Sequence, residues 1–363
     1  MKIVKSFCQF NTMVILAVAC LVQSCHSGQG TDKANLKSIK PAIVLNSPEG
    51  GARFKVGDSI VFSFSTADSI PEADSICLVV NKKKQVMSQL SKGKISWSSG
   101  KSKLGQAVIE ISYFTKGQAY TCSGLVYLMA AQAPKELKYS VVKTYLHDKE
   151  SYTQGLLVDK GILYESAGEY GKSTLRKYAF PSMKLISKIA LDDKYFAEGL
   201  ALYKNKLYQI TWQEQTCFVY SASDLSKLNE FRYSIQEGWG LVFDGKEFIC
   251  SDGSSTLYFL DPETFKEVHR VDVYDDKQAI TQLNELEYIN GKVFANIYQT
   301  DNIAEIDPST GQVIAMMNMK GLLTAADRHP KIDVLNGIAG LPNGNILVTG
   351  KNWPKLYEIK LSR

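Results

Sequence analysis

One short phrase recurs five times in the second half of the chain, and the residue at its second position varies in chemistry. The phrase is typified by Ala197-Glu198-Gly199-Leu200 and returns at intervals of 41 to 52 residues. Its second members are Gln154, Glu198, Trp239, Asn284 and Asn336. Glu198 alone among them has a side chain that ionises near neutral pH. One carboxyl among amides and an indole favours general acid/base chemistry on a small polar group over metal or phosphate binding.

A second set of residues follows the first at a nearly constant distance. Trp212, Tyr298 and Lys351 stand 14 or 15 residues after a phrase position, and Tyr152 and Phe196 stand two residues before one. The first strand of a hairpin begins, and the second ends, at the same edge, so both sets should line one opening. We expect a pocket whose aromatic walls surround the carboxyl and raise its pKa. The expected site residues are Tyr152, Gln154, Phe196, Glu198, Trp212, Trp239, Asn284, Tyr298, Asn336 and Lys351. For any single aromatic or amide among them, a structural role near the axis is an equal alternative.

The length and content of the repeat predict the fold. Repeats of about 40 to 50 residues built from short β-rich runs and turns are typical of β-propellers, whose blades stack around an axis. Five phrases predict an all-β, five-bladed β-propeller over residues 139–363, with the phrase glycines in close packing near the axis. Asp261-Pro262 and Asp307-Pro308 are expected at hairpin tips rather than in catalysis. The run from Tyr139 to Leu146 is expected to pair with the last strand and close the ring.

Residues 41–133 differ in sequence pattern from the rest of the chain. Short β-branched runs alternate in polarity and are bounded by turn residues, which predicts a small immunoglobulin-like β-sandwich with Trp97 in its core. No chemical constellation lies there, so a spacer or docking module is the expected role. Residues 132–136 are expected to form the linker.

The N-terminus is typical of an export signal. Lys2 and Lys5 precede an apolar run over residues 13–22 that is too short to span a bilayer. Ser24-Cys25 resembles a lipobox, so residues 1–25 are interpreted as a lipoprotein signal, with Cys25 lipidated and residues 26–40 as a polar tether. The expected location is the bacterial cell envelope, held to the membrane through the lipid anchor only. An ordinary cleaved signal with an incidental cysteine is the alternative.

Composition narrows the function classes further. The net charge is +5, and no basic stripe is interleaved with aromatic residues, so nucleic acid is not an expected partner. The sequence has no CxxC motif and no zinc-type spacing, so a zinc hydrolase is disfavoured. In an exported chain the remaining cysteines permit the disulfides Cys77–Cys122 and Cys217–Cys250, and buried free thiols are an equal alternative.

The motifs of residues 139–363 resemble the glutaminyl-peptide cyclotransferases of the plant type, the five-bladed family typified by the papaya latex enzyme. The segments that carry the resemblance are 152–156, 196–200, 210–212, 238–241, 283–287, 296–301, 333–339 and 349–356. The resemblance implies a substrate with an N-terminal glutamine and the products pyroglutamate and ammonia. It also implies that Glu198 is the acid/base and that Tyr152, Gln154, Phe196, Trp212, Trp239, Asn284 and Lys351 belong to the active site. Tyr298 stands where the plant enzyme is expected to have tryptophan, which puts substrate preference in doubt.

The implied chemistry agrees with the residue types. One carboxyl can take a proton from the attacking α-amine and give one to the leaving ammonia, while Asn284, Gln154 or Lys351 stabilises the oxyanion. No cofactor or metal is required, although a structural Ca2+ in the channel is compatible with such folds. Two other functions stay open, a non-catalytic peptide-binding propeller and a calcium-dependent propeller lactonase or hydrolase. The single carboxyl of the ring speaks against the lactonase.

Overall fold

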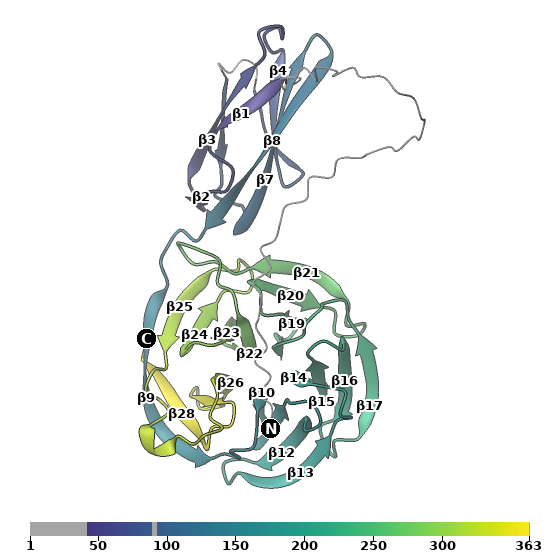
Figure 1. Ribbon diagram of the computed structural model, residues 1–363, viewed down its shortest axis with the longest axis vertical. Helices are drawn as coiled ribbons and strands as arrows, with labels where there is room; N and C mark the ends of the chain where they lie inside the picture. The colour runs from purple at the N-terminus through teal and green to yellow at the C-terminus, as the bar shows by residue number, and fades with distance from the viewer. Residues whose placement is uncertain (1–41, 89–92, 363) are drawn as a thin grey trace, which may run out of the picture. The chain divides into compact units, whose positions relative to one another are not determined.

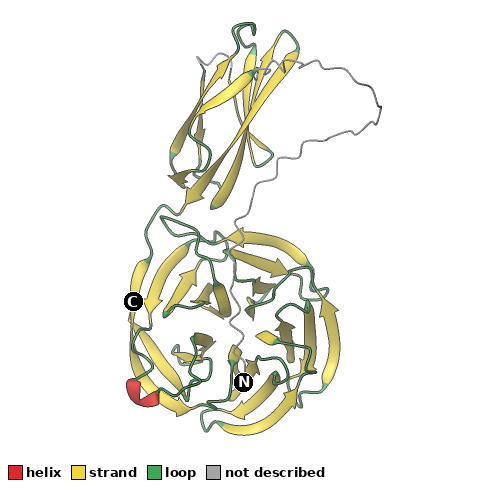
Figure 2. Ribbon diagram, viewed as in Figure 1, coloured by secondary structure: helices red, strands yellow, loops and turns green. Residues whose placement is uncertain are grey.

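The computed structural model describes residues 42–88 and 93–362, and their secondary structure is almost entirely β (Figure 2). The one short helix in this part of the chain is the 3-10 turn η1 (Ala325–Asp327). The expected all-β class is therefore confirmed. The expected signal, tether and lipidated Cys25 lie outside the described residues. No helix among the described residues is long and apolar enough to cross a membrane.

The N-terminal strands form two sheets that share one core. A three-stranded sheet has the order β1-β3-β6, and a five-stranded sheet has the order β2-β8-β7-β4-β5. Ile60, Phe62 and Phe64 are buried at alternate positions of the second strand in the first sheet, as a half-buried strand requires. They pack with Ile109 and with Trp97, which is buried as expected. The bounds are β1 (Ile43–Ser47), β2 (Ala52–Lys55), β3 (Ser59–Thr66), β4 (Ser75–Val80), β5 (Lys83–Ser88), β6 (Lys94–Ser98), β7 (Gly105–Thr115) and β8 (Gln118–Met129).

The remaining strands form three four-stranded antiparallel sheets and one eight-stranded sheet. The first sheet contains β10 (Thr153–Asp159), β11 (Ile162–Ala167), β12 (Thr174–Ala179) and β13 (Lys184–Ala190). The second contains β14 (Ala197–Tyr203), β15 (Lys206–Thr211), β16 (Thr216–Ser221) and β17 (Lys227–Arg232). The third contains β18 (Leu241–Phe243), β19 (Phe248–Ser251), β20 (Thr256–Leu260) and β21 (Glu267–Asp272). The eight-stranded sheet contains β22 (Leu283–Ile289), β23 (Lys292–Ile297), β24 (Asn302–Ile306), β25 (Val313–Asn318), β9 (Lys135–Leu146), β28 (Lys355–Ser362), β27 (Ile346–Gly350) and β26 (Leu335–Gly340), in that order.

These sheets surround a common axis. Figure 1 shows β10, β14, β22 and β26 near the centre and β13, β17, β21 and β9 at the periphery. The inner strands contact one another in the order β10, β14, β18, β22 and β26, and β26 returns to β10. Four inner strands begin with the recurring phrase, and β18 (Leu241–Phe243) begins at its last residue, so the phrase positions lie together at the centre of this closed circle.

Strand β9 closes the circle and begins earlier than expected. Tyr139 pairs with Leu361, and Leu146 pairs with Lys355, so the expected pairing with the last strand is confirmed. The strand starts at Lys135, however, because Lys135 pairs in parallel with Ala315 of β25. The expectation that the linker extends through residue 136 is therefore wrong, because Lys135 and Glu136 belong to β9 and pair with β25.

The aspartates expected at hairpin tips are confirmed in that place. Asp261 Oδ1 accepts hydrogen bonds from the backbone N–H groups of Glu263 and Thr264 at 3.1 and 2.8 Å. Asp307 Oδ1 accepts the N–H of Ser309 at 2.9 Å. Each carboxylate thus closes its own turn, which is the usual use of aspartate before proline.

All four described cysteines are free thiols. Cys77 pairs across β4 and β7 with Ser112, while Cys122 pairs across β8 and β7 with Ile111. A strand therefore lies between them, and about 10 Å between alternate strands exceeds the Cα span of a disulfide. Cys217 and Cys250 lie in one buried cluster, and burial raises the pKa of both thiols. Of the two alternatives, the structure supports the free thiols.

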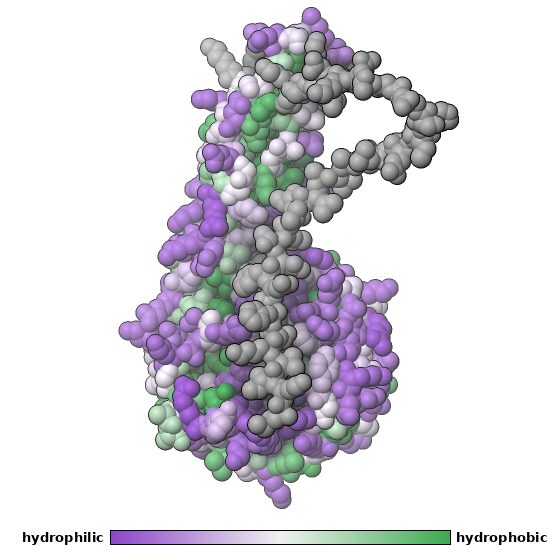
Figure 3. Space-filling model, in the orientation of Figure 1, coloured by the Kyte–Doolittle hydropathy of each residue, from purple (hydrophilic) through white to green (hydrophobic). Residues whose placement is uncertain are grey.

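Hydrophilic side chains predominate on the face shown in Figure 3 around the ring of sheets. The exposed large hydrophobic residues of the described chain are mostly aliphatic and are spread over several strands, with examples in Val142 on β9, Ile186 on β13 and Val268 on β21. Tyr170 is the one aromatic among them, with 47% of its surface exposed. It marks the opening of the site described next.

Candidate functional site

Nine of the ten expected site residues line one cavity of about 270 Å³. The cavity opens at the centre of the ring of sheets, where the inner strands begin. The lining residues are Tyr152, Gln154, Phe196, Glu198, Trp212, Trp239, Asn284, Tyr298 and Lys351. The tenth, Asn336, does not line the cavity but lies directly behind Gln154, to which it is hydrogen-bonded.

Irregular strand starts aim the phrase residues at the cavity. The pairing register shifts around Gln154 in β10, around Glu198 in β14 and around Asn284 in β22. A bulge of this kind inserts an unpaired residue and redirects its side chain. The glycine that follows allows neighbouring inner strands to meet, because a Cβ on Gly199 would lie 2.3 Å from the backbone N of Leu241. The expected close packing of the phrase glycines is therefore confirmed.

Asn336, Gln154 and Glu198 form a chain of hydrogen bonds that ends at the Glu198 carboxyl group. Asn336 donates from Nδ2 to Gln154 Oε1 at 3.0 Å and to the carbonyl oxygen of Thr153 at 2.9 Å. Those bonds fix the orientation of the Gln154 amide, so its Nε2 points to Glu198 Oε1 and donates at 2.9 Å. The amide therefore leaves the second carboxyl oxygen of Glu198 available for another partner.

Glu198 is held in an environment that favours its neutral form. Its side chain is buried, with 5% of the residue exposed. Burial raises the pKa of Glu198 well above its usual value; the Lys351 cation opposes the shift, and the carboxylates of Glu237 and Glu214 add to it. A carboxyl whose pKa is moved towards neutrality can both accept and return a proton at physiological pH.

Lys351 is the second charged residue of the cavity and is also buried. Its Nζ lies 4.7 Å from the ring centroid of Tyr152 and 5.0 Å from that of Tyr298. Within the described residues it forms no ion pair, so its positive charge is balanced by aromatic faces and by Glu198 at longer range. Burial lowers the pKa of Lys351, while Glu198 and Asp333 oppose that shift. The ammonium group can therefore donate to an incoming anionic oxygen without first breaking an ion pair.

The aromatic residues contact one another along the cavity wall. Tyr152 and Phe196 meet edge to face with ring centroids 6.3 Å apart, and Phe196 meets Trp212 at 5.8 Å. Trp239 meets Tyr298 edge to face at 5.4 Å. Such contacts favour defined ring orientations, so the wall presents a shaped apolar surface to a ligand.

Four polar residues near the opening are absent from the expected set. Tyr170 donates from its hydroxyl to Glu214 at 2.9 Å and packs its ring against Phe196. Tyr152 donates from its hydroxyl to Asp333 at 2.8 Å. Glu237 accepts from the indoles of both cavity tryptophans. Its signal was in the sequence, because Glu237 stands two residues before a phrase position, as Tyr152 and Phe196 do.

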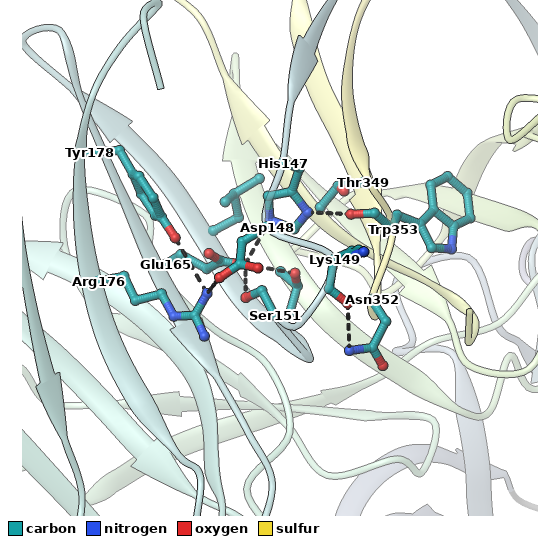
Figure 4. A network of polar contacts seen from close by, with 12 residues as sticks. His147, Asp148, Lys149, Ser151, Glu165, Arg176, Tyr178, Thr349, Asn352 and Trp353 are labelled. Carbon is teal, nitrogen blue, oxygen red and sulfur yellow. Dashed lines mark hydrogen bonds and ion pairs between the residues drawn. The ribbon is translucent and has the colours of Figure 1, made fainter. Parts of the chain in front are cut away.

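A buried ionic network lies behind the cavity (Figure 4). Glu165 of β11 is completely buried and accepts hydrogen bonds at Oε1 from Ser151 at 2.5 Å, Thr153 at 2.7 Å and His147 Nε2 at 2.9 Å. Burial alone would lower the pKa of His147, but the Glu165 carboxylate raises it above its ordinary value. Burial would raise the pKa of Glu165, but His147 and then Arg176 lower it to about 2. The pairing therefore favours the charged form of both groups.

The same network joins the two chain segments that carry Gln154 and Lys351. The other ring nitrogen of His147, Nδ1, contacts the carbonyl oxygen of Trp353 at 2.7 Å. Asn352 donates from its backbone N to the carbonyl oxygen of Ser151 at 2.7 Å. These bonds hold the segment before β10 against the segment after β27. They thereby fix the Gln154 amide and the Lys351 ammonium group relative to each other.

Two further carboxyls, the buried Glu285 and the half-buried Glu287, support the inner strands rather than the cavity. Glu285 accepts the backbone N–H of Leu156 at 3.1 Å and that of Ile338 at 2.8 Å. Glu287 accepts the N–H of Gly340 at 2.8 Å, and burial raises its pKa to about 8. Neither residue lines the cavity. Residues 42–88 and 93–362 contain no cluster of three or more His, Cys, Asp or Glu side chains that could hold a metal ion.

Known proteins share this region of the chain. A family model described as glutamine cyclotransferase matches residues 113–361. A glutaminyl-peptide cyclotransferase of Arabidopsis thaliana is 43% identical over 229 residues, which cover 61% of this chain and 71% of that protein. The crystal structure of glutaminyl cyclase from Myxococcus xanthus matches at 37% identity with a TM-score of 0.58, covering 63% of this chain and 98% of that one. The residues that the family model matches include every residue that lines the cavity.

Proposed function

Because the chain belongs to the glutamine cyclotransferase family, we propose that it is a glutaminyl-peptide cyclotransferase. The substrate is a peptide or protein with a free N-terminal glutamine, and the products are the pyroglutamyl peptide and ammonia. The observation that carries the proposal is the buried Glu198 carboxyl, oriented by Gln154 inside an aromatic cavity. Such a cavity suits the short polar side chain of glutamine better than a charged or extended group.

In the proposed mechanism the substrate closes on itself. The α-amine nitrogen attacks the side-chain amide carbon, a new C–N bond forms, and the Glu198 carboxylate takes a proton from the amine. The tetrahedral intermediate then breaks its original C–NH2 bond, and Glu198 returns the proton to the leaving group, which departs as ammonia. Because the reaction is intramolecular, holding the side chain in a cyclising conformation supplies much of the acceleration.

The developing negative oxygen requires donors that are not already engaged. One of the two N–H groups of Gln154 Nε2 already donates to Glu198, and this bond directs the amide to the carboxyl group. The side-chain amide of Asn284 makes no hydrogen bond within the described residues, and the Lys351 ammonium forms no ion pair there. We assign the oxyanion to these two side chains. Every step is thus assigned to a side chain of the protein, so the proposal includes no required cofactor or metal, and turnover should persist after chelation.

The proposal includes a domain arrangement. The closed circle of inner strands, with phrases at a regular interval, supports a five-bladed β-propeller over residues 139–363, extended at its start to Lys135. The two sheets that share one core support an immunoglobulin-like β-sandwich over residues 41–133. In this arrangement the site residues all belong to the propeller.

Ammonia release from a glutaminyl dipeptide tests the proposed function. Gln-Ala should yield ammonia and a cyclised product, whereas the same dipeptide acetylated on its α-amine should yield neither, because it lacks the nucleophile. An Asn-Ala dipeptide should react far more slowly, since its shorter side chain cannot close the five-membered ring. No ammonia from Gln-Ala, or equal release from the acetylated dipeptide, would contradict a cyclotransferase.

We also propose that the protein is exported and held to a bacterial membrane by a lipid on Cys25. The support is the charged start, short apolar run and Ser24-Cys25 junction of the sequence. Mass spectrometry of membrane-extracted protein should find a lipidated Cys25 as the first residue. A Cys25→Ala protein that still partitions with membranes would show that the anchor is wrong while leaving the cyclotransferase proposal intact.

A further inference from the structure

The aromatic wall of the cavity consists of two groups of rings that make no direct ring contact with each other within the described residues. One group is Tyr152, Phe196 and Trp212, and the other is Trp239 and Tyr298. Lys351 joins them on one side, because its ammonium lies over the rings of both Tyr152 and Tyr298. On the other side, Trp212 and Trp239 make no ring contact with each other in the described part of the chain.

Glu237 bridges that second side. Its Oε2 accepts the indole N–H of Trp212 at 2.9 Å and the indole N–H of Trp239 at 3.1 Å. Its Oε1 accepts Nε2 of Gln213 at 3.3 Å. Hydrogen bonds to a charged acceptor are stronger than neutral ones, so one carboxylate fixes two rings at once.

The backbone holds Glu237 in place for this task. Gly238 donates its N–H to the carbonyl oxygen of Trp212 at 2.8 Å. The chain is closely packed there, because a Cβ on Gly238 would lie 2.4 Å from the Tyr233 hydroxyl oxygen. The carboxylate therefore stands on a rigid segment that connects the two sheets from which the tryptophans come.

The hydrogen bonds determine which way the Trp239 indole faces, which ring packing alone does not. Trp239 packs against Gly253, where an added Cβ would lie 2.6 Å from the indole, and this contact restricts the plane of the ring. An indole turned over in the same plane keeps most of that contact but points its N–H elsewhere, since the terminal torsion of tryptophan is broad and roughly two-fold. An acceptor at a fixed point selects one of the two orientations.

We propose that Glu237 is a positioning residue of the glutaminyl site, which clamps Trp212 and Trp239 so that the aromatic wall keeps one shape for the substrate side chain. The proposal rests on the cyclotransferase function above. Glu237 touches no reacting atom. Its carboxylate adds to the raised pKa of Glu198, but its hydrogen bonds go to the two indoles, so it should act mainly on substrate binding.

Steady-state kinetics with Gln-Ala tests the clamp. Glu237→Ala should raise KM by about tenfold or more, because two hydrogen bonds to a charged acceptor are lost, and should change kcat much less. Glu237→Gln keeps an acceptor oxygen of the same reach and should restore much of the loss in KM. The matched control is Glu230→Ala on β17, an exposed glutamate paired with Lys227 and remote from the indoles, which should leave both constants unchanged.

A fluorescence measurement on the tryptophans tests the clamp independently of the proposed function. Acrylamide quenching of tryptophan emission should increase in Glu237→Ala and not in Glu230→Ala, whether or not the protein turns over Gln-Ala. An inactive wild-type protein contradicts the cyclotransferase, and quenching then still tests the clamp. Unchanged quenching, unchanged KM in an active protein, or a loss confined to kcat each overturns the positioning role of Glu237.

Discussion

At the scale of single residues, the site combines two opposite charges that are kept apart. Glu198 and Lys351 are both buried. Burial favours the neutral form of each, so it raises the pKa of Glu198 and lowers the pKa of Lys351. Each charge also stabilises the other, because Lys351 lowers the pKa of Glu198 and Glu198 raises that of Lys351. The raised pKa makes the carboxyl a better proton donor and acceptor partner for the substrate near neutral pH than a free glutamate, and the ammonium stays free to meet an oxyanion.

Lys351→Met should move the pH dependence of the reaction in a definite direction. In the proposed mechanism the carboxylate form of Glu198 takes the proton from the amine, so kcat/KM should rise with pH through the pKa of Glu198. Removing the cation that lowers this pKa should shift the rising limb to higher pH and reduce the maximal rate. The comparison variant is Lys227→Met on the outer strand β17, and an unshifted or acid-shifted limb in Lys351→Met would argue against the coupling.

The sequence predicted the site residues at the second position of the recurring phrase and missed Glu237, which stands two residues before one of them. Gln154, Glu198 and Asn284 were predictable because equivalent positions of a closed repeat are related by rotation. Glu237 stands in the same register as Phe196, but a carboxylate there gave no reason to expect a pair of indole partners. Hydrogen bonds between sheets depend on side-chain directions that spacing alone does not determine.

At the scale of elements, a bulge at the start of an inner strand and an ionic network behind it position the site together. The bulge at Gln154 turns its amide to Glu198, and the adjacent Thr153 hydroxyl is bound to Glu165. Glu165 also binds His147, which contacts Trp353 beyond Lys351. A change in this network should therefore affect stability first and the geometry of the site second.

Glu165→Gln should destabilise the protein by about 3–5 kcal/mol, because it leaves the buried His147 and Arg176 cations without their common anion. Urea unfolding measures the change. Glu230→Gln, in an exposed pair on β17, should cost about 0.5 kcal/mol or less and serves as the control. A Glu165→Gln protein as stable as the control variant would show that the network does not hold the ring together.

The His147 side of the pair gives a pH signature. The pKa of His147 is raised in the folded protein, so its contribution to stability should be fully present below about pH 6.5 and lost as pH rises through the folded pKa. The pKa of Glu165 is lowered from 4.5 to about 2, so its contribution should be fully present above pH 4.5 and lost as pH falls towards the folded pKa. The Tm of wild type should fall more steeply above neutrality than that of His147→Gln, and parallel curves would contradict the pairing.

At the scale of the whole molecule, strand β9 joins the beginning and end of the ring. Its first residues pair with β25 and the rest pair with β28. The sequence predicted the second pairing from the strand pattern near the C-terminus. It did not predict the first, because the Gln132 to Glu136 stretch has the composition of a linker and its partner is far away in the chain.

Two fragments of the protein test the pairing of β9 with β25 separately from its pairing with β28. A protein of residues 133–363 keeps all of β9 and should fold and cyclise Gln-Ala at a rate near that of the mature chain. A protein of residues 139–363 loses the pairing of Lys135 to Leu137 with β25 and should unfold with a free energy lower by about 1–3 kcal/mol. An inactive 133–363 fragment beside an active full chain would place residues 42–132 in the catalytic unit.

The most direct test of the central claim is Glu198→Gln assayed for both turnover and binding of a glutaminyl peptide. The amide keeps the size of the side chain and can still accept from Gln154, but it cannot carry the proton between the amine and the leaving group. The account predicts that kcat falls by at least about 10²-fold, the usual contribution of general acid/base catalysis, while the peptide binds nearly as in wild type. Turnover close to that of wild type would contradict the assignment of Glu198 and with it the proposed mechanism.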